Sequence, residues 1–524
     1  MSPHEQRLVR FLSRRAAYPH PAGAIGHRET HVSHVFLAGR FAYKLKKPVR
    51  FPFLDASTLA SRKRFCQLEL SLNRRLAPTV YLGIVPVTET PQGLKLGGRG
   101  RVIEWLVKMQ RLPEAQMLDQ VVARRQASRR DMAAIADRLI AFFRIAQRSR
   151  RIDYYGAPAQ VAELVLGNLR ECAPFVGTLL PPAQRRRLEL AYRQYLALHE
   201  PLLARRVRER RIIDGHGDLR CENICLTKAV DIFDCVEFQP AFRCGDIAND
   251  LSFLLMDLEF RGRGDLAGVV EQRYRRRVQD PTFPAVLPLY KCHRSLVRAK
   301  VRGFAWLQHP ATAEGRRLRG LSRRHFQLAG RYARQLAAPR LVVVGGLIGT
   351  GKSTLARSLA EALGAVWLRT DEIRLREFAR TRRKGQGFGE GLYAAHVSDL
   401  VYQRLIQRAE AHLRRGASVV CDGTFSKASG RALLREIARR SGASFHFFEC
   451  VVPRAVALRR VAKRAAAKSD LSEARPEHYG RLKAGYDPVR GWSARDWTRL
   501  SDHRPPQQTF QAALAALRRA WRTG

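Results

Sequence analysis

The chain has 524 residues, too many for one typical domain, so two to four domains are expected. A composition of 45% hydrophobic and 27% charged residues excludes a disordered chain. The net charge of +49 comes mostly from arginines spread along the whole chain, without long basic blocks. Nucleic acid is therefore not expected to be the main ligand, although the charge permits binding to it.

Nine cysteines stand at irregular intervals, four of them between residues 221 and 244. They lack the paired Cys-x-x-Cys spacing of structural zinc sites, which favours buried thiols in a reducing cytosol. The N-terminus lacks the continuous apolar segment of a signal peptide, and no apolar run reaches membrane-spanning length. We expect a soluble, cytoplasmic protein without a membrane partner, and leave its oligomeric state open.

The first 24 residues predict a short amphipathic helix, and residues 31–37 and 41–45 then predict a hairpin around the turn 38–40. Its second strand carries Lys44 in the apolar-Ala-apolar-Lys pattern of the kinase strand lysine. Residues 62–76 predict a helix bearing Glu69. A strand lysine paired with a helix glutamate orders nucleotide phosphates in kinases, and we expect that pair here.

Residues 80–87 and 102–109 predict two further strands, and residues 109–113 then resemble the hinge that holds an adenine between kinase lobes. This part of the chain, to about residue 112, is the expected N-lobe. Residues 117–209 are predicted to be mostly helical, with arginines on the polar faces.

The stretch from Ile213 to Phe238 carries the pattern of a phosphoryl-transfer site. Asp218 lies at a His-Gly-Asp-Leu turn, Asn223 follows five residues later, and Asp234 ends the apolar segment 230–233. One aspartate to accept a hydroxyl proton, with an asparagine and a second aspartate to hold Mg²⁺, is the set that such transfer needs. Asp246 is expected to brace the catalytic loop from below, the alternative being a surface helix cap.

The pattern breaks at residues 337–340, where we place a domain boundary. A buried strand, 341–344, is followed by a G-x-x-x-x-G-K-[ST] sequence and a helix with leucines every four residues. Such a loop binds phosphates through backbone N–H groups, its lysine reaches the β and γ phosphates, and its serine ligates Mg²⁺. The residues expected to bind ATP here are Gly346, Gly349, Gly351, Lys352, Ser353 and Thr354.

Strands are then predicted at residues 365–368, 417–421 and 444–451, with a short fifth at 498–501. Asp371 follows the second strand of this domain, and Asp422 ends the third at the position of an aspartate near the metal. Alternating strands and helices predict a doubly wound parallel sheet, with ligands at the carboxyl ends of its strands.

Residues 25–335 resemble the aminoglycoside and choline phosphotransferase family, a branch of the protein-kinase-like fold. HGDLRCEN matches the family's HGDLHxxN signature, and IFDCVEF stands where its metal-binding segment stands. The resemblance implies that Asp218 is the catalytic base, that Asn223 and Asp234 bind Mg²⁺, and that Lys44 with Glu69 orders the phosphates. Arg220 replaces the commoner histidine, and Cys-Val-Glu follows Asp234 where a small or aromatic residue is usual.

Residues 340–524 resemble the small P-loop kinases typified by gluconate kinase and polynucleotide kinase, of AAA family ATPase type. The resemblance implies that Asp371 acts as a base, that Arg374 contacts the acceptor, and that Arg460 and Arg464 are lid arginines. The order of the two parts resembles a bacterial fusion family.

Together these observations predict an α+β bilobal protein-kinase-like domain at 25–336 and an α/β P-loop NTPase domain at 337–524. The expected function is a bifunctional kinase that transfers the γ-phosphoryl group of Mg-ATP to a hydroxyl of a small molecule in each module. A nucleic-acid end kinase or a nucleotide-sugar kinase in the P-loop domain remains open. So does a non-catalytic, ATP-binding regulator in one module, and the sequence names neither acceptor.

Overall fold

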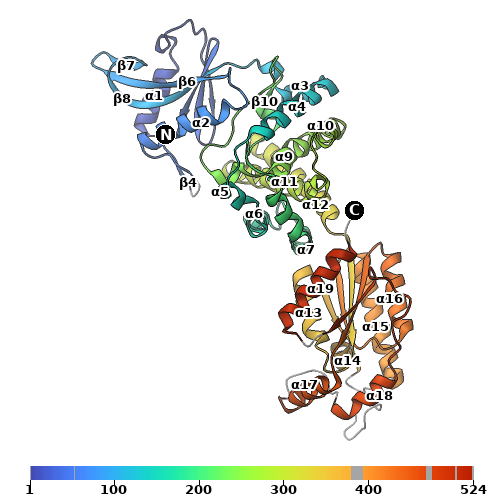
Figure 1. The fold of residues 1–524 in the computed structure, drawn as a ribbon. Coiled ribbons are helices and arrows are strands. Elements are labelled where there is room, and N and C mark those ends of the chain that lie inside the picture. The colour runs from blue at the N-terminus through green and yellow to red at the C-terminus, as the bar shows by residue number, and fades with distance from the viewer. Residues whose placement is uncertain (1, 52–53, 379–393, 468–474, 502–503, 522–524) are drawn as a thin grey trace. The chain divides into compact units, whose positions relative to one another are not determined.

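The computed structural model describes the chain except residues 1, 52–53, 379–393, 468–474, 502–503 and 522–524, and the side chains of 464–467. Its contacts divide the chain into two compact units (Figure 1). Unit 1 consists of residues 1–164 and 202–328, and unit 2 of residues 165–201 and 329–524. The segment 165–201 thus groups with the C-terminal residues, although the sequence placed it in the first domain.

Unit 1 begins with a six-stranded antiparallel sheet in the order β1-β2-β3-β8-β6-β7. The predicted hairpin is confirmed as β2 and β3, joined through Gly39. The sequence missed the edge strand β1 and the short β7. The strands of this sheet are β1 (Gly26–Glu29), β2 (Ser33–Ala38), β3 (Phe41–Lys46), β6 (Tyr81–Thr90), β7 (Gly93–Leu96) and β8 (Arg101–Gln110).

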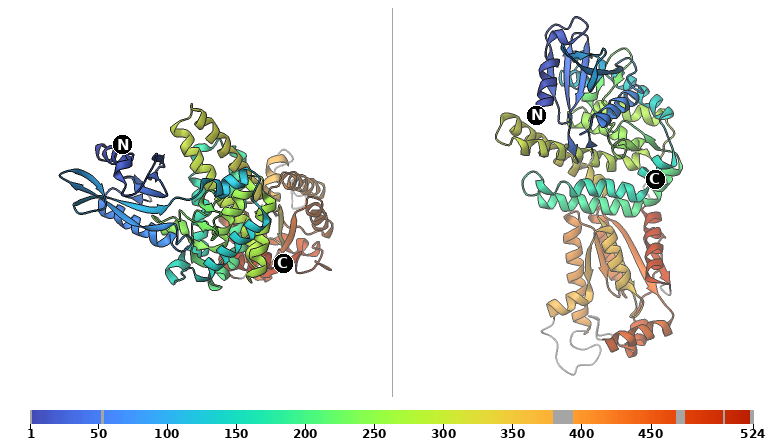
Figure 2. Two further views of the ribbon diagram at one scale, coloured as in Figure 1. Left: turned by 90° about the horizontal axis from the view of Figure 1, so that it is seen from above. Right: turned by 90° about the vertical axis from the view of Figure 1, so that its left-hand side faces the viewer.

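Helices α1 (Pro3–Leu12) and α2 (Leu59–Asn73) cover opposite faces of this sheet (Figure 2). Strand side chains alternate between faces, so Tyr43 and Leu45 pack in the core that includes α1. Ala42 packs with Cys66 of α2, which puts Lys44 on the α2 side of the sheet. Helix α2 starts one turn before the predicted residue 62, because Thr58 accepts a hydrogen bond from the Ser61 N–H and caps it.

The rest of unit 1 is largely helical, as predicted. Helix α9 is buried nearly all round and packs against α11, which accounts for its run of apolar residues. The helices are α3 (Leu118–Ala123), α4 (Arg129–Ile145), α5 (Arg150–Asp153), α8 (Pro240–Arg243), α9 (Ile247–Phe260), α10 (Gly264–Arg277), α11 (Phe283–Gln308) and α12 (Ala313–Leu336), whose last residues belong to unit 2. Two-stranded pairs join β4 (Arg50–Phe51) to β5 (Leu54–Asp55), β9 (Ile212–Asp214) to β12 (Cys244–Asp246) and β10 (Ile224–Cys225) to β11 (Asp231–Ile232).

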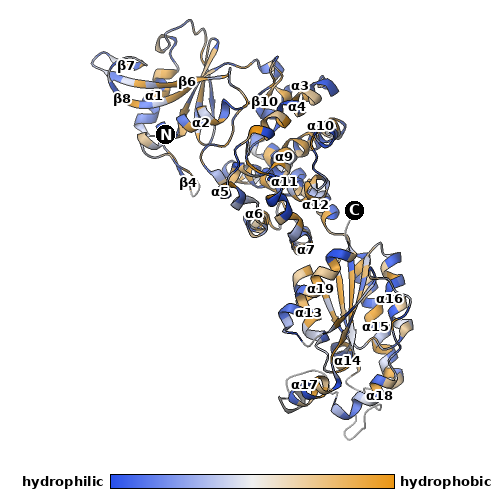
Figure 3. Ribbon diagram, in the orientation of Figure 1, coloured by the Kyte–Doolittle hydropathy of each residue, from blue (hydrophilic) through white to orange (hydrophobic). Residues whose placement is uncertain are grey.

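Unit 2 contains a five-stranded parallel sheet in the order β14-β15-β13-β16-β17. Apolar cores lie on both faces, one with α13 and α19 and the other with α15 and α16, so the predicted doubly wound sheet is confirmed (Figure 1). Its strands are the apolar centre of this unit (Figure 3). The elements are β13 (Arg340–Gly346), α13 (Lys352–Leu363), β14 (Val366–Arg369), α14 (Thr370–Phe378), α15 (Ala395–Arg414), β15 (Val419–Asp422), α16 (Ala428–Arg440), β16 (Ser444–Val451), α17 (Arg454–Ala467), α18 (Tyr479–Ala484), β17 (Trp497–Ser501) and α19 (Pro506–Ala520).

The segment 165–201 of unit 2 contains the end of α6 (Pro158–Arg170) and most of α7 (Pro182–Arg208). Gln194 donates a hydrogen bond to the Ser418 hydroxyl at 2.5 Å, and that hydroxyl also accepts the Arg340 N–H at 3.1 Å. Leu198 packs in the same core as Val342 and Leu359. This part of α7 therefore completes one end of the parallel sheet.

All nine cysteines are buried and free of disulfides. Among the described residues, no group of three or more histidines, cysteines or carboxylates is placed to hold a metal ion. None of the described helices combines the length and the apolar character needed to cross a membrane.

Candidate active sites

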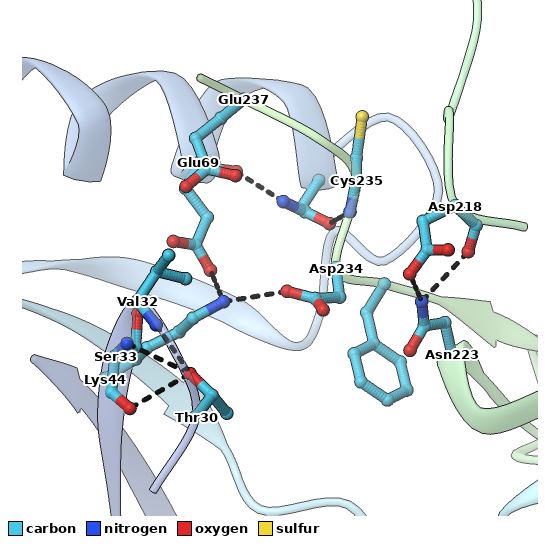
Figure 4. Close-up of polar contacts among 12 residues, drawn as sticks. Thr30, Val32, Ser33, Lys44, Glu69, Asp218, Asn223, Asp234, Cys235 and Glu237 are labelled. Carbon is cyan, nitrogen blue, oxygen red and sulfur yellow. Dashed lines mark hydrogen bonds and ion pairs between the residues drawn. The ribbon is translucent and has the colours of Figure 1, made fainter. Parts of the chain in front are cut away.

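Lys44 is the centre of a charged cluster in unit 1 (Figure 4). Its Nζ lies 2.8 Å from a carboxylate oxygen of Glu69 and 2.7 Å from one of Asp234. Burial alone would lower the pKa of Lys44, but the two carboxylates outweigh it and raise that pKa well above its usual value. Burial conversely would raise the pKa of Glu69, and Lys44 together with Lys46 lowers it to about 2. Lys44 and Glu69 are therefore fully charged at neutral pH.

Lys46 and Glu237 belong to the same cluster, and the sequence analysis missed both. Lys46 Nζ lies 2.6 Å from Glu69 and 2.5 Å from Glu237, and its side chain is buried. A signal was present, because residues two apart on a strand share a face, so Lys46 had to lie beside Lys44. Glu237 supplies the charge that this second buried lysine requires, which explains a glutamate three residues after Asp234.

Asp218 and Asn223 lie together at the catalytic loop. Asn223 Nδ2 donates to the backbone oxygen of Asp218 at 2.9 Å and to its carboxylate at 3.0 Å. Arg220 donates to both carboxylate oxygens of Asp218, at 2.7 and 2.8 Å. Burial would raise the pKa of Asp218, but the Arg220 guanidinium outweighs it and holds that pKa below the usual value. Asp218 is thus ionised and oriented.

The residue that braces the catalytic loop is Asp250, not Asp246, so that prediction is wrong. The Asp250 carboxylate accepts the backbone N–H groups of His216 and Gly217, at 2.7 and 2.9 Å. Asp246 caps α9 through the Ala248 N–H and forms a buried ion pair with Arg206, at 2.6 and 2.7 Å. Both aspartates flank the start of one helix, and only the tertiary position of the loop distinguishes them.

His216 links the catalytic loop to the segment that carries Asp234. One ring nitrogen lies 3.0 Å from the backbone oxygen of Phe233, and the other lies 3.3 Å from the backbone N–H of Asp218. Burial lowers the pKa of His216, which favours the neutral ring that can donate to one group and accept from the other. The ring therefore sets the spacing between the loop and Asp234.

The oxygen atoms of Asn223 and Asp234 fit a bound Mg²⁺. Because Asn223 directs its amide nitrogen at Asp218, its amide oxygen is left to act as a ligand. Asp234 uses one carboxylate oxygen for Lys44, and its side chain is 44% exposed. Its backbone has a φ of 62°, rare for a residue other than glycine, which marks a functional position where strain is tolerated.

The predicted hinge follows β8. The N–H groups of Gln110 and Arg111 donate to the backbone oxygens of Val80 and Arg40, so both are used within the N-terminal part of unit 1. Leu112 packs with Ala42 and other residues of the α2 side of the sheet. The role of this segment in adenine binding stays a prediction.

In unit 2 the P-loop joins β13 to α13, at the carboxyl end of the sheet. Gly346 and Gly349 have φ of 144° and 78°, and a Cβ at either would lie 2.4 Å from a backbone oxygen, of Cys450 and Ala457 respectively. Only glycine fits at these positions. Lys352 Nζ lies 3.5 Å from the backbone oxygen of Leu347, and so folds over the loop.

Ser353 and Asp422 lie together beside the P-loop, with the hydroxyl donating to the carboxylate at 3.2 Å. Burial raises the pKa of Asp422, partly offset by the charge of Lys352. A serine hydroxyl and a carboxylate at this position fit Mg²⁺ bound to a nucleotide. Thr354 follows on the exposed side of the first turn of α13.

The acceptor and lid residues of unit 2 are placed less completely. Asp371 lies in the first turn of α14, just after the end of β14, and its charge acts on Asp422. Arg374 is buried, with its guanidinium 3.3 Å from the Ser398 hydroxyl, which rules out a surface arginine. Arg460 is half-buried on α17, whose Ala457 packs on Ile348 of the P-loop. The side chain of Arg464 lies outside the described residues.

Comparison with curated proteins identifies close relatives in mycobacteria. The chain is 35% identical over 448 residues to the uncharacterized proteins Rv2004c of Mycobacterium tuberculosis and Mb2027c of Mycobacterium bovis. The alignment covers 85% of this chain and 87% of either relative. The chain belongs to the family of these mycobacterial proteins. Residues 341–489 also match the AAA domain family, which spans the P-loop and Asp422.

The solved structures similar to parts of the chain include kinases. A sugar kinase from Janibacter sp. HTCC2649 is 23% identical, covers 34% of this chain and 94% of its own, and has a TM-score of 0.28. A choline/ethanolamine kinase family protein from Mesorhizobium loti is 14% identical, covers 62% of this chain and 99% of its own, and has a TM-score of 0.36. At these TM-scores the likeness carries no argument about activity.

Proposed function

We propose that the protein is a bifunctional ATP-dependent phosphotransferase, with one kinase module in each unit. Each module transfers the γ-phosphoryl group of Mg-ATP to a hydroxyl of a small molecule. The observation that carries the proposal is the position of Lys44 between Glu69 and Asp234, in one site with Asp218 and Asn223. A buried cation, an ionised base and two oxygen ligands are what phosphoryl transfer needs.

In the first module Lys44 would bind the phosphates, with Glu69 holding the ammonium in place. Asn223 and Asp234 would hold Mg²⁺, which when bound neutralises charge on the phosphates. Asp218 would orient the acceptor hydroxyl and receive its proton. Because the transition state of this transfer is loose, a base with a low pKa suffices, and positioning supplies most of the rate.

In the second module the P-loop N–H groups and Lys352 would bind the phosphates, and Ser353 with Asp422 would hold Mg²⁺. Asp371 would accept the proton of the acceptor, Arg374 would contact the acceptor, and Arg460 and Arg464 would act as lid arginines that close on the transferred phosphate. The supporting observations are the two loop positions, Gly346 and Gly349, that accept only glycine, and the hydrogen bond from Ser353 to Asp422.

The test is ATP turnover by the full chain with one module silenced at a time. Asp218→Ala should leave only the activity of the second module, Lys352→Ala only that of the first, and the double variant neither. A panel of sugars, aminoglycosides, nucleosides and oligonucleotides would then identify each acceptor. Full turnover by the double variant would contradict the proposal.

A further inference from the structure

A cluster of arginines lies beside Asp218 in unit 1, between helices α9 and α11. Residues four apart on a helix share a face, so Arg294, Arg298 and Arg302 form a row along α11. Arg294 donates to the backbone oxygen of Gly217, which fixes the inner end of the row at the catalytic loop. We name the following residues the arginine cluster: Arg220, Arg261, Arg294, Arg298, Arg302 and Arg324.

The carboxylates that face the arginine cluster are already engaged by its members Arg220 and Arg261, by Asn223 or by backbone N–H groups. Asp218 is held by Arg220 and Asn223, and Asp250 accepts two backbone N–H groups. Glu222 pairs with Arg220 and, at 3.2 Å, with Arg261. Asp257 accepts from Arg261 at 3.2 Å and from the backbone N–H of Cys221 at 3.1 Å.

Arg298 and Arg302 are the members of the cluster with the weakest compensation. Arg298 reaches Glu222 only at 4.0 Å, its side chain is 14% exposed, and its buried Nε has no hydrogen-bond acceptor. Arg302 lies 2.7 Å from a ring nitrogen of His325, which must be neutral to accept from it. Burial and the neighbouring arginines lower the pKa of Arg298, and they lower that of Arg302 to about 10.

The cluster is also open toward solvent at its outer end. Arg220 and Arg294 are buried, Arg298 and Arg302 are half-buried, and Arg324 is exposed. Phe260 holds the outer guanidinium groups, with Arg302 and Arg324 at 5.3 and 4.6 Å from the centre of its ring. Exposure therefore increases along the cluster from the end at Asp218 toward Arg324.

We propose that this cluster is an acceptor subsite for an anion, so that the first module phosphorylates a hydroxyl compound bearing a phosphate or carboxylate group. The inference rests on the proposed kinase function of unit 1. Arg298 and Arg302 bind the anionic group, while the hydroxyl lies at Asp218. Guanidinium groups bind phosphate and carboxylate through paired N–H donors. A cationic acceptor is disfavoured here, since an ammonium group would face arginines that outnumber the facing carboxylates.

Direct binding of inorganic phosphate tests the subsite. Equilibrium dialysis with ³²P-phosphate would use the full chain carrying Lys352→Ala, alone and combined with Arg298→Gln or Arg302→Gln. The matched control is Arg273→Gln, which removes an arginine that pairs with Asp137 outside the cluster. We expect the cluster variants to weaken phosphate binding on the order of tenfold or more, and the control to leave it unchanged. Equal binding by all variants would overturn the proposal.

Matched acceptors then test the substrate class and distinguish phosphate from carboxylate. Ribose would be compared with ribose 5-phosphate, and glucose with glucuronate, with choline as the cationic compound. We expect an anionic member to have the higher kcat/KM, and Arg298→Gln to raise its KM while the KM for ATP stays constant. Preference for neutral or cationic acceptors would overturn the inference.

Two controls separate the possible failures. Arg298→Lys keeps the charge and should retain most phosphate binding. A fold defect in Arg298→Gln would appear as a lowered Tm. In that case Arg302→Gln, at a half-buried position, becomes the test. Phosphate binding that depends on the cluster without any ATP turnover would contradict the kinase function alone. ATP turnover together with phosphate binding that is unchanged in the cluster variants would contradict the anion subsite alone.

Discussion

Arg220 holds both carboxylate oxygens of Asp218, with Nε at 2.7 Å from one and Nη2 at 2.8 Å from the other. The candidate base therefore already has a charged partner two residues along the chain. A carboxylate held in this way is ionised well below neutral pH, and its orientation is fixed by a rigid planar group.

Removing that partner should change the pH dependence of the first module. Without the Arg220 charge, burial is offset only by more weakly acting groups such as Arg298, and the pKa of Asp218 rises. Since the ionised form is required, Arg220→Gln should shift the acid limb of kcat toward higher pH. The measurement is kcat against pH at saturating Mg-ATP, in the full chain carrying Lys352→Ala. Arg220→Lys keeps a charge and should move the limb less, and an unmoved limb in both variants would contradict the assignment.

The buried Arg206 should contribute strongly to the stability of unit 1. Its guanidinium pairs with Asp246 and Asp280 and is fully buried. Arg206→Met leaves buried Asp246 without its cation and buried Asp280 with only Arg211 at 3.9 Å, and should cost about 3–5 kcal/mol in the free energy of unfolding. Denaturant unfolding at pH 7 would measure it.

The same variant should show a specific dependence on pH. Burial would raise the pKa of Asp280, but Arg206 lowers it, so the stabilisation exists above the unfolded-state pKa and disappears as pH falls through the folded one. The stability difference between wild type and Arg206→Met should therefore shrink below about pH 4. Arg273→Gln, which breaks a partly exposed ion pair, should cost within about 1 kcal/mol. A cost for Arg206→Met as small as this would contradict the expectation.

Lys46 is expected to support ATP use by the first module through Glu69. Lys46→Met removes one of the two cations on Glu69 and leaves Glu237 unpaired. We expect kcat/KM for ATP to fall by about tenfold, against 10²–10³-fold for Lys44→Met, which loses the group on the phosphates. Initial rates with varied ATP would compare them. An effect of Lys46→Met equal to that of Lys44→Met would make Lys46 a direct phosphate ligand.

Gly349 and Gly416 offer a matched pair in unit 2, because their φ values are 78° and 76°. A Cβ at Gly349 would lie 2.4 Å from the Ala457 backbone oxygen, whereas one at Gly416 meets nothing within 4 Å. Gly349→Ala should abolish ATP binding by the second module, since the loop must move. Gly416→Ala should cost only about 1 kcal/mol of stability. Titration with a fluorescent ATP analogue, in the full chain carrying Lys44→Met so that the first module does not bind ATP, would check both, and equal affinities would contradict the argument.

Much of the fold could be predicted from local patterns. The P-loop could be predicted from the sequence alone, because the G-x-x-x-x-G-K-[ST] pattern between a strand and a helix is typical of a phosphate-binding loop. The pairing of Lys44 with Glu69 could be predicted, because alternating apolar residues place Lys44 on a strand and helical periodicity places Glu69 on the next helix. Asp250 was not distinguishable from Asp246, since the difference lies in where the His216–Gly217 backbone passes. The arginine cluster could not be predicted for another reason. The chain has 95 lysines and arginines, and only the fold shows which six arginines lie together.

Unit 2 is built from two stretches of chain that are far apart in the sequence. During synthesis, residues 165–201 leave the ribosome before any strand of the parallel sheet exists. Leu198 and Gln194 therefore stay without their native partners Val342 and Ser418 until those residues have also been synthesised. Assembly of the P-loop unit therefore requires a contact between residues far apart in the sequence, and a chain that begins at residue 337 would lack the part of α7 that packs at one end of the sheet.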